Sequence, residues 1–280
     1  MKLLLTGANG MLGRTLQRRL AGHTLRLTDL PELDITRLDA VEQAWSAFQP
    51  EAVIHCAAMT AVDACEAEPD RAFAVNELGS ANVAMACQRH QARLIAISTD
   101  YVFRGDLDRP YHEGDTPSPR TVYGASKLAG EEAIRAHCPD HAILRTAWLY
   151  GPGGPSFVHA MLKAGSSEGA PVRVVNDQVG NPTSTDALAG AIEQILATRL
   201  TGTFHASCEG EATWYAFARA IFDTFQLPRA LVPCTTAEFP RPAPRPANSR
   251  LEKRALRLHG LPPMPHWQAA LEEFARSAVG

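Results

Sequence analysis

Tyr123 and Lys127 stand four residues apart in 121-TVYGASKLAGEEA-133, a stretch that is typical of the beginning of a helix. A tyrosine hydroxyl has an ordinary pKa near ~10, and a neighbouring ammonium group favours the phenolate and lowers that pKa. A tyrosine tuned toward neutral pH could exchange a proton with a substrate. Residues at this spacing also share any solvated helix face, so the elements around the pair must decide between chemistry and a plain surface.

The first residues of the chain predict a strand, a glycine turn and a helix. The apolar run 2-KLLLT-6 leads into 7-GANGMLG-13, and leucines follow at helical spacing. This order is the context that a dinucleotide-binding fingerprint requires. The turn would let backbone amides approach a pyrophosphate, and free N–H groups at the helix start would face the anion. The cofactor contacts that we expect in this segment are Gly7, Gly10, Met11, Leu12 and Gly13.

Residues after the second predicted strand, 24-TLRLT-28, are candidates for contacts with the adenosine half of the cofactor. Asp29 lies close to the ~20-residue offset of a ribose-binding carboxylate, although a turn residue at a strand end would look the same. Asp29 would repel a 2′-phosphate, and no arginine follows at once, which favours NADH without excluding NADPH. Asp34 and Ile35 could contact the adenine, or Asp34 could instead cap a helix.

Apolar runs and helical stretches alternate through the middle of the chain. The runs 52-AVIHCAA-58, 93-RLIAIS-98, 142-AILRT-146 and 172-VRVV-175 predict strands separated by helices. This alternation predicts an α/β fold, a Rossmann-type doubly wound parallel sheet with a smaller C-terminal substrate-binding part. We expect residues 1–150 to form the dinucleotide-binding domain, completed by about 171–200. Residues 151–170 and 201–280 would form the substrate-binding part.

Two polar stretches leave the carboxyl ends of predicted strands, where ligands of parallel sheets bind. The first, 57-AAMTAVD-63, would pass beside the cofactor and place Ala58, Met59 and Thr60 near its nicotinamide half. The second, 98-STDYVF-103, puts Thr99 and Asp100 at the mouth of the sheet. Thr99 lies 24 positions before Tyr123 in the chain.

Together these motifs resemble the extended short-chain dehydrogenase/reductases, and within that superfamily the dTDP-4-dehydrorhamnose reductases. The resemblance rests on the glycine spacing, on Y-x-x-x-K, and on the stretches STDYVF, VYGASKLAGE, RTAWLYG, NDQVGNPT and RPANSRL. It extends from residue 2 to about residue 270. It implies an enzyme that uses NADPH or NADH to reduce the C4 ketone of dTDP-4-dehydro-β-L-rhamnose to dTDP-β-L-rhamnose, in nucleotide-sugar synthesis for cell-surface polysaccharide.

The resemblance also implies roles for individual residues. Tyr123 would protonate O4 of the sugar, Lys127 would hold the nicotinamide ribose, and Thr99 would hydrogen-bond near the carbonyl. The implied substrate contacts are Thr99, Asp100, Tyr101, Val62, Trp148 and Arg250. Tyr101 and Trp148 could also be buried core aromatics. Arg250 closes the proline-rich stretch 240-PRPAPRPANSRL-251, which could instead be a polyproline linker.

Related sugar-nucleotide dehydratases carry Thr-Asp-Glu, with an acid and a base that eliminate water. This chain has Thr99, Asp100 and Tyr101 in that order, so the glutamate position holds a tyrosine. Elimination therefore lacks one partner, which favours simple ketone reduction.

The amino-acid composition limits the kinds of partner that the protein could bind. A net charge of -3 gives no basic footprint for nucleic acid, and no segment approaches the roughly 18 apolar residues of a membrane span. The apolar run near the start is too short for a signal peptide. Six cysteines without a C-x-x-C pair indicate reduced thiols, and ten histidines show no metal-ligand spacing. We therefore expect a cytoplasmic protein with no nucleic-acid or membrane partner and no histidine-built metal site.

Three points stay open at this stage. Magnesium-bridged dimers are described in the family, with a glutamate just after the glycine turn, and Thr15 stands there in this chain, which argues against Mg²⁺ and leaves a homodimer open. The enzyme could reduce another 4-keto-6-deoxy nucleotide sugar. A non-catalytic NADP-binding regulatory subunit, resembling that of methionine adenosyltransferase, could also keep Thr99, Tyr123 and Lys127.

Overall fold

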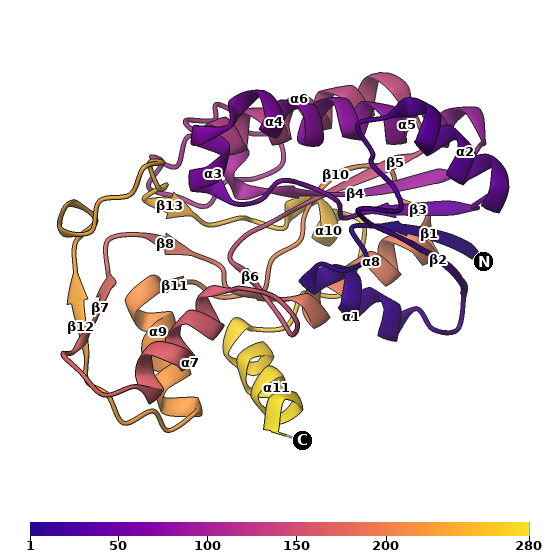
Figure 1. Ribbon diagram of the computed structural model, residues 1–280. Helices are drawn as coiled ribbons and strands as arrows, with labels where there is room; N and C mark the ends of the chain where they lie inside the picture. Colours follow the sequence, from indigo (N-terminus) through magenta and orange to yellow (C-terminus); the bar gives the residue numbers. More distant parts are fainter. Residues whose placement is uncertain (280) are drawn as a thin grey trace.

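A parallel sheet forms the centre of the computed structural model, which describes residues 1–279. Within that range six strands are hydrogen-bonded in the order β10-β5-β4-β3-β1-β2 (Figure 1). Every pairing in this sheet is parallel. The strands are β1 (Lys2–Thr6), β2 (Thr24–Thr28), β3 (Ala52–His55), β4 (Arg93–Thr99), β5 (His141–Thr146) and β10 (Gly202–His205). The predicted α/β, doubly wound Rossmann-type sheet is confirmed.

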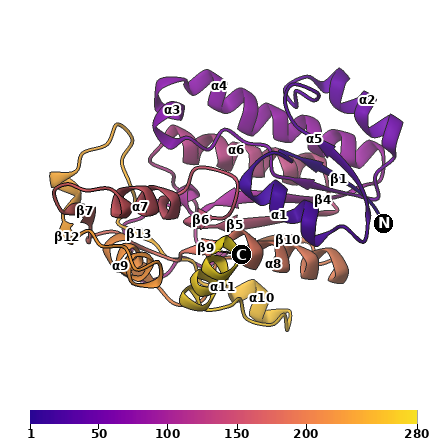
Figure 2. The same cartoon turned by 60° about the horizontal axis from the view of Figure 1, so that its bottom comes forward.

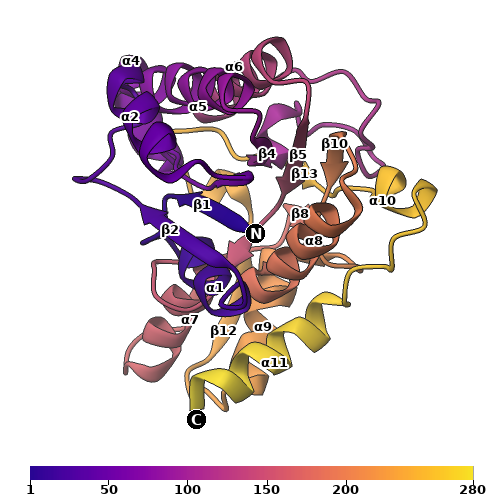
Figure 3. The same cartoon turned by 90° about the vertical axis from the view of Figure 1, so that its right-hand side faces the viewer.

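The apolar runs are continuous because helices cover both faces of the sheet. Leu3 and Leu5 of β1 pack into one core with α1 and α8, whereas Leu4 points into a second core with α2, α5 and α6. Figure 3 shows these two helix layers on opposite sides of the strands. The helices are α1 (Met11–Arg19), α8 (Thr185–Thr198), α2 (Leu38–Phe48), α5 (Gly79–Arg89) and α6 (Val122–His137).

Two strands differ from the expected placement. The predicted strand 172–175 exists as β7 (Val172–Val175), but it pairs with β12 (Leu231–Cys234) in a separate small sheet. Its Arg173 is exposed between apolar neighbours, which suits a sheet with one open face rather than a doubly covered one. The edge strand beside β5 is instead β10, from the range that we assigned to the substrate-binding part.

A second layer of elements lies beyond the carboxyl ends of the large sheet (Figure 2). Its core is aromatic, with Tyr150, Phe217, Trp267 and Phe274 in contact. The elements of this region are β6 (Leu149–Tyr150), α7 (Phe157–Ser166), β8 (Val179–Gly180), β9 (Thr183–Ser184), β11 (Ala212–Thr213), α9 (Trp214–Thr224), a 3₁₀ turn (Thr236–Glu238), β13 (Asn248–Ser249) and α11 (Trp267–Val279). The short helix α10 (Arg254–Leu258) packs on β10 instead.

The helical stretch from Pro69 to Arg89 contains a π-helical segment. After α3 (Val62–Ala67), α4 (Pro69–Phe73) continues through a π segment (Ala74–Leu78) into α5. Inside that segment the buried Asn76 accepts a hydrogen bond from the N–H of Met59 at 2.8 Å and donates to the Met59 carbonyl oxygen at 3.0 Å. Asn76 also donates to Ser126 Oγ of α6 at 3.0 Å. One amide therefore fixes the loop after β3 against α6.

Substitution of Gly130 tests how tightly α6 packs on the π segment. A Cβ atom at Gly130 would overlap the carbonyl oxygen of Asn76. We expect Gly130→Ala to lower the free energy of unfolding by roughly 1–3 kcal/mol, the usual cost of overpacking. Urea denaturation measures the change. Gly22→Ala is the matched control, since a Cβ there meets nothing within 4 Å. Equal stability of the two variants would contradict the packing argument.

Candidate active site

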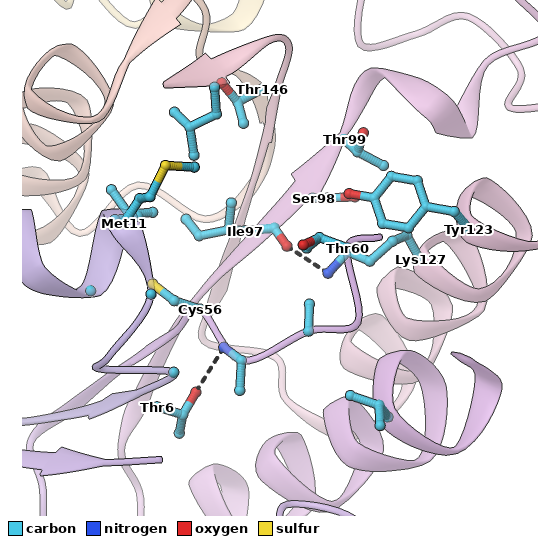
Figure 4. A pocket seen from close by; sticks show the side chains of 18 of the residues that line it. Thr6, Met11, Cys56, Thr60, Ile97, Ser98, Thr99, Tyr123, Lys127 and Thr146 are labelled. Carbon is cyan, nitrogen blue, oxygen red and sulfur yellow. Dashed lines mark hydrogen bonds between the residues drawn. The ribbon is translucent and has the colours of Figure 1, made fainter. Parts of the chain in front are cut away.

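One elongated cavity of about 570 Å³ runs along the carboxyl ends of β1, β3, β4 and β5. Figure 4 shows Thr6, Cys56, Thr99 and Thr146 at these strand ends, with Tyr123 and Lys127 projecting from α6. The same cavity contains the glycine turn at one end and Trp148 and Trp214 at the other. The sequence motifs thus converge on a single site.

The glycine turn forms a cradle that fits a dinucleotide pyrophosphate. Gly7 has a φ of +66°, and a Cβ there would lie 2.6 Å from the backbone nitrogen of Ala57. At Gly10 a Cβ would meet only the Gly7 carbonyl, at 3.3 Å. No side chain caps the start of α1, so its first N–H groups face the cavity. The cavity lining in this segment includes Gly7, Gly10, Met11, Leu12 and Gly13.

The acidic residues after β2 lie at the same end of the cavity. Asp29 lines the wall and accepts hydrogen bonds from the N–H groups of Asn9 and Leu30, both at 2.8 Å. These contacts attach the end of β2 to the glycine turn. Asp34 and Ile35 also line the cavity. Asp34 accepts from the Thr36 N–H at 2.9 Å in a local turn, whereas Arg37 is the N-cap of α2, so Asp34 does not cap that helix.

The loop after β3 contributes alternate residues to the wall. Ala58, Thr60 and Val62 line the cavity, but Met59 is not among the lining residues. Asn76 binds both backbone polar groups of Met59, and the Met59 side chain packs on the cluster that contains Cys65, Ala72 and Tyr123. Met59 therefore shapes the loop from behind rather than facing the cavity.

Tyr123 and Lys127 are buried side by side, with 9% and 7% of their surfaces exposed. Thr121 caps α6 by accepting from the Gly124 N–H at 3.0 Å, which places the pair in the first two turns of the helix. Lys127 Nζ donates to the carbonyl oxygen of Ile97 at 2.8 Å. The tyrosine ring points into the cavity beside Ser98 and Thr99 (Figure 4). The solvated-surface interpretation of the pair is therefore wrong.

The protonation of Tyr123 differs from our expectation. Burial raises the pKa of Tyr123 above its ordinary value, and a hydrogen bond with Thr99 offsets only part of that rise. Burial lowers the pKa of Lys127 to about 8, against the opposing influence of Glu131. Desolvation disfavours the phenolate and is the largest influence on this pKa, so the expected lowering by the lysine is not found. The phenol stays protonated at neutral pH, as a proton donor must.

Thr99, Asp100 and Tyr101 form the wall opposite Lys127. Thr99 Oγ1 donates to Asp100 Oδ1 at 3.0 Å and accepts from the Tyr101 N–H at 3.2 Å. Burial raises the pKa of Asp100 to about 6, and its Oδ2 has no protein partner. The Tyr101 and Tyr123 rings contact each other edge to face, with their centroids 5.4 Å apart. Tyr101 also lines the cavity, so it both packs on Tyr123 and is available to a ligand.

Trp148 closes the far end of the cavity together with Trp214. The two indoles stack with centroids 3.5 Å apart and an angle of 7° between their planes. Trp148 has a φ of +49°, an uncommon conformation for a bulky residue and one that marks functional segments. Sequence reasoning missed Trp214 because it begins α9, more than sixty residues later and in no recognised motif. We also did not predict that the cavity is lined by Ile97, Cys56 and Thr146, because residues of these types at strand ends look like core residues.

Arg250 does not line the cavity. Its guanidinium donates to the Asp108 carbonyl at 2.7 Å, to Asn248 Oδ1 at 2.9 Å and to Glu211 at 3.1 Å. Arg245 likewise lies outside the lining and forms a bidentate pair with Asp63, with both distances 2.9 Å. The end of the proline-rich stretch is folded, since β13 pairs with β8. Both arginines are thus committed to protein partners.

Residues 1–279 contain no group of three or more histidine, cysteine or acidic side chains that could hold a metal ion. Thr15 is buried and donates to Thr185 Oγ1 at 2.8 Å, joining α1 to α8. The position is therefore part of the core. Nor is any helix within the described residues both long and apolar enough to cross a membrane.

Comparison with known proteins decides the family. The model of the RmlD substrate binding domain family matches residues 1–279. The chain belongs to this family. It is 44% identical to the dTDP-4-dehydrorhamnose reductase of Streptomyces griseus, covering 99% of this chain and 94% of that protein. It is 42% identical to a probable dTDP-4,6-dihydroxy-2-methyloxan-3-one 4-ketoreductase of Streptomyces antibioticus, covering 98% and 94%.

A solved member of the RmlD family has the same fold. The Bacillus anthracis dTDP-4-dehydrorhamnose reductase in complex with NADP superposes with a TM-score of 0.96 at 40% identity, and 99% of each chain is covered. The resemblance seen in the sequence motifs is thus confirmed over the whole chain.

The protonation of Asp100 can be tested through stability. Because burial raises its pKa to about 6 from 3.8, the wild type loses stability as pH rises through that window, whereas Asp100→Asn does not. Between pH 4 and pH 8 the variant should gain roughly 2–3 kcal/mol on the wild type, at ~1.4 kcal/mol per pKa unit. Urea denaturation at both pH values measures the gap. The control is Asp108→Asn on the exposed loop, and a similar gap there would contradict the burial argument.

Proposed function

We propose that this protein reduces the C4 ketone of dTDP-4-dehydro-β-L-rhamnose to give dTDP-β-L-rhamnose, with NADPH or NADH as reductant. Support comes from the RmlD family membership and from the S. griseus relative named for this activity. The proposed reaction takes place in the cytoplasm, where it supplies a nucleotide sugar for cell-surface polysaccharide. The observation that carries the proposal is that Tyr123 and Lys127 lie buried, beside Thr99, in the cavity that also holds the glycine turn.

The residues at the sheet edge account for the proton that reduction requires. A nicotinamide cofactor held in this cradle would supply the hydride that C4 receives. Tyr123 donates its phenolic proton to O4 as negative charge develops there, and Thr99 Oγ1 holds the carbonyl and the tyrosine in register. Lys127, fixed by the Ile97 carbonyl at 2.8 Å, stabilises the phenolate left after transfer and orients the nicotinamide ribose. Burial of the site keeps water away from the ketone.

The cofactor cradle supports binding of either nicotinamide dinucleotide. The first N–H groups of α1 would hold the pyrophosphate, and Asp29 would hold the adenosine ribose. The B. anthracis relative binds NADP. Asp29 is already bonded to the N–H groups of Asn9 and Leu30, so its carboxylate is fixed rather than free to turn away. The ratio of kcat/KM for NADPH and NADH measures which of the two cofactors this fixed carboxylate favours.

The aromatic end of the cavity suits the sugar-nucleotide. Trp148 and Val62 would contact the sugar ring, and Trp148 is held rigid by its stack on Trp214. Tyr101 stands where dehydratases carry a glutamate, and a phenol beside Tyr123 provides no carboxylate for elimination. We propose that α7, α9 and α11, with the small sheets, form the substrate-binding part. Arg250 has protein partners and is not proposed as a substrate contact.

A different 4-keto-6-deoxy nucleotide sugar is the second candidate substrate. The S. antibioticus relative named as a 4-ketoreductase of another dTDP-sugar is nearly as similar to this chain as the S. griseus enzyme. Nothing in the Tyr123 and Thr99 geometry distinguishes the two ketones, because both reactions need the same proton donor. A higher kcat/KM for such a sugar than for dTDP-4-dehydro-L-rhamnose would favour the second candidate.

The proton-donor role predicts the behaviour of Tyr123→Phe. With dTDP-4-dehydro-L-rhamnose supplied, NADPH or NADH oxidation should proceed in the wild type and fall by about 10²–10⁴-fold in the variant, the usual contribution of general acid catalysis. Absorbance of the reduced cofactor measures the rate.

Tyr215→Phe is the matched control, since Tyr215 of α9 does not line the cavity, and its rate should equal that of the wild type. A wild-type protein that is folded and binds the cofactor but shows no turnover would contradict the enzyme assignment. That outcome would favour the regulatory-subunit alternative, which co-purification with a synthetase partner would then test.

A further inference from the structure

A buried carboxylate, Glu131, lies one turn beyond Lys127 on α6 and is not needed by the reaction proposed above. Only 2% of Glu131 is exposed. Its Oε1 accepts from Ser98 Oγ at 2.6 Å and from Arg145 Nε at 2.8 Å. Its Oε2 accepts from Arg145 Nη2 at 2.7 Å and from Arg135 Nη2 at 2.6 Å. Four donors thus converge on one carboxylate.

These contacts join α6 to two neighbouring strand ends. Ser98 immediately precedes Thr99 on β4, and its partner in the sheet register is Arg145 of β5. One residue earlier on β4, Ile97 accepts the Lys127 hydrogen bond. The helix is therefore attached to the end of β4 at two consecutive residues, and to β5 through Arg145. A shift of α6 along the sheet would break all three attachments together.

Glu131 also influences the charge of Lys127, as the ionisable groups around the lysine show. The ionisable groups that face the lysine are Tyr123 and Glu131 on α6, His55 and Cys56 at the end of β3, and, beyond Glu131, Arg145 of β5 and Arg135. Burial lowers the pKa of His55 to about 3 and raises that of Cys56 to about 12, so both are neutral at pH 7. Glu131, whose pKa its arginine partners lower, supplies the negative charge near the buried amine.

We propose that Glu131 is a positioning residue: it keeps Lys127 charged inside the cavity and aligns Tyr123 with Thr99 by tying α6 to the ends of β4 and β5. A purely structural ion pair would stabilise the fold but leave the charge of Lys127 unchanged. The two roles therefore differ in a quantity that can be measured without any substrate.

The direct test is NMR titration of ¹³C-labelled lysine side chains in the ligand-free protein. The chain has four lysines, and the Lys127→Met variant assigns the signal. In Glu131→Gln the Lys127 pKa should fall by about one pH unit, the lower end of the effect of removing a neighbouring opposite charge. Arg135→Ala is the matched control, because Arg135 binds the same carboxylate but is 37% exposed, and Lys127 should titrate there as in the wild type. An unchanged titration in Glu131→Gln would overturn the proposal.

A second readout rests on the proposed reductase function. Because loss of the carboxylate favours neutral Lys127, the alkaline limb of kcat against pH should move to lower pH in Glu131→Gln. Glu131→Asp keeps the charge but shortens the side chain, so its Lys127 titration should match the wild type while kcat falls at least tenfold. If Glu131→Gln does not fold, Glu131→Asp decides alone, and an unchanged kcat or a lowered Lys127 pKa would overturn the proposal. Absence of turnover in the wild type would contradict the function while leaving the NMR test valid.

Discussion

The rest of the site depends on burying the amine of Lys127. Removing a charged ammonium from water is costly unless partners replace the lost hydration. Here the Ile97 carbonyl accepts its hydrogen bond and Glu131 provides a compensating charge. Both partners are available only if α6 lies directly against the end of β4. Close packing of α6 continues at Gly130, where a Cβ atom would overlap the Asn76 carbonyl oxygen of the π segment.

Close contacts also join the glycine turn, the loop after β3 and α6 to one another. Asn76 uses the irregular backbone of the π segment to hold both the Met59 loop and Ser126 of α6. Gly7 brings the first turn within contact of Ala57 on that loop. A single set of short contacts thus positions the glycine turn, Tyr123 and Lys127 relative to one another. Such pre-organisation reduces the reorganisation needed when charge develops in the reaction.

Local patterns were sufficient to predict much of this arrangement. The glycine turn, the alternating strands and the Tyr123–Lys127 spacing are short-range signals. The residues that carry them lie at the carboxyl ends of the parallel strands, as expected for this kind of sheet. The sheet edge was not predictable in the same way, because 172-VRVV-175 and 202-GTFH-205 are both short and their pairing depends on long-range packing. The sequence did not predict the contacts of Trp214 and Asn76, because both residues pack against segments that are distant in the chain. The pKa of Tyr123 was predicted in the wrong direction because spacing shows the neighbouring charge but not the depth of burial.

We propose that hydride and proton are added to the C4 carbonyl of a dTDP-sugar within this one cavity. The most direct measurement supplies NADPH carrying deuterium at the transferable C4 position, with dTDP-4-dehydro-L-rhamnose as substrate, and locates the label by NMR. We expect deuterium at C4 of dTDP-L-rhamnose, with an equatorial hydroxyl on the same carbon. Deuterium at another carbon, or a product without label, would contradict it.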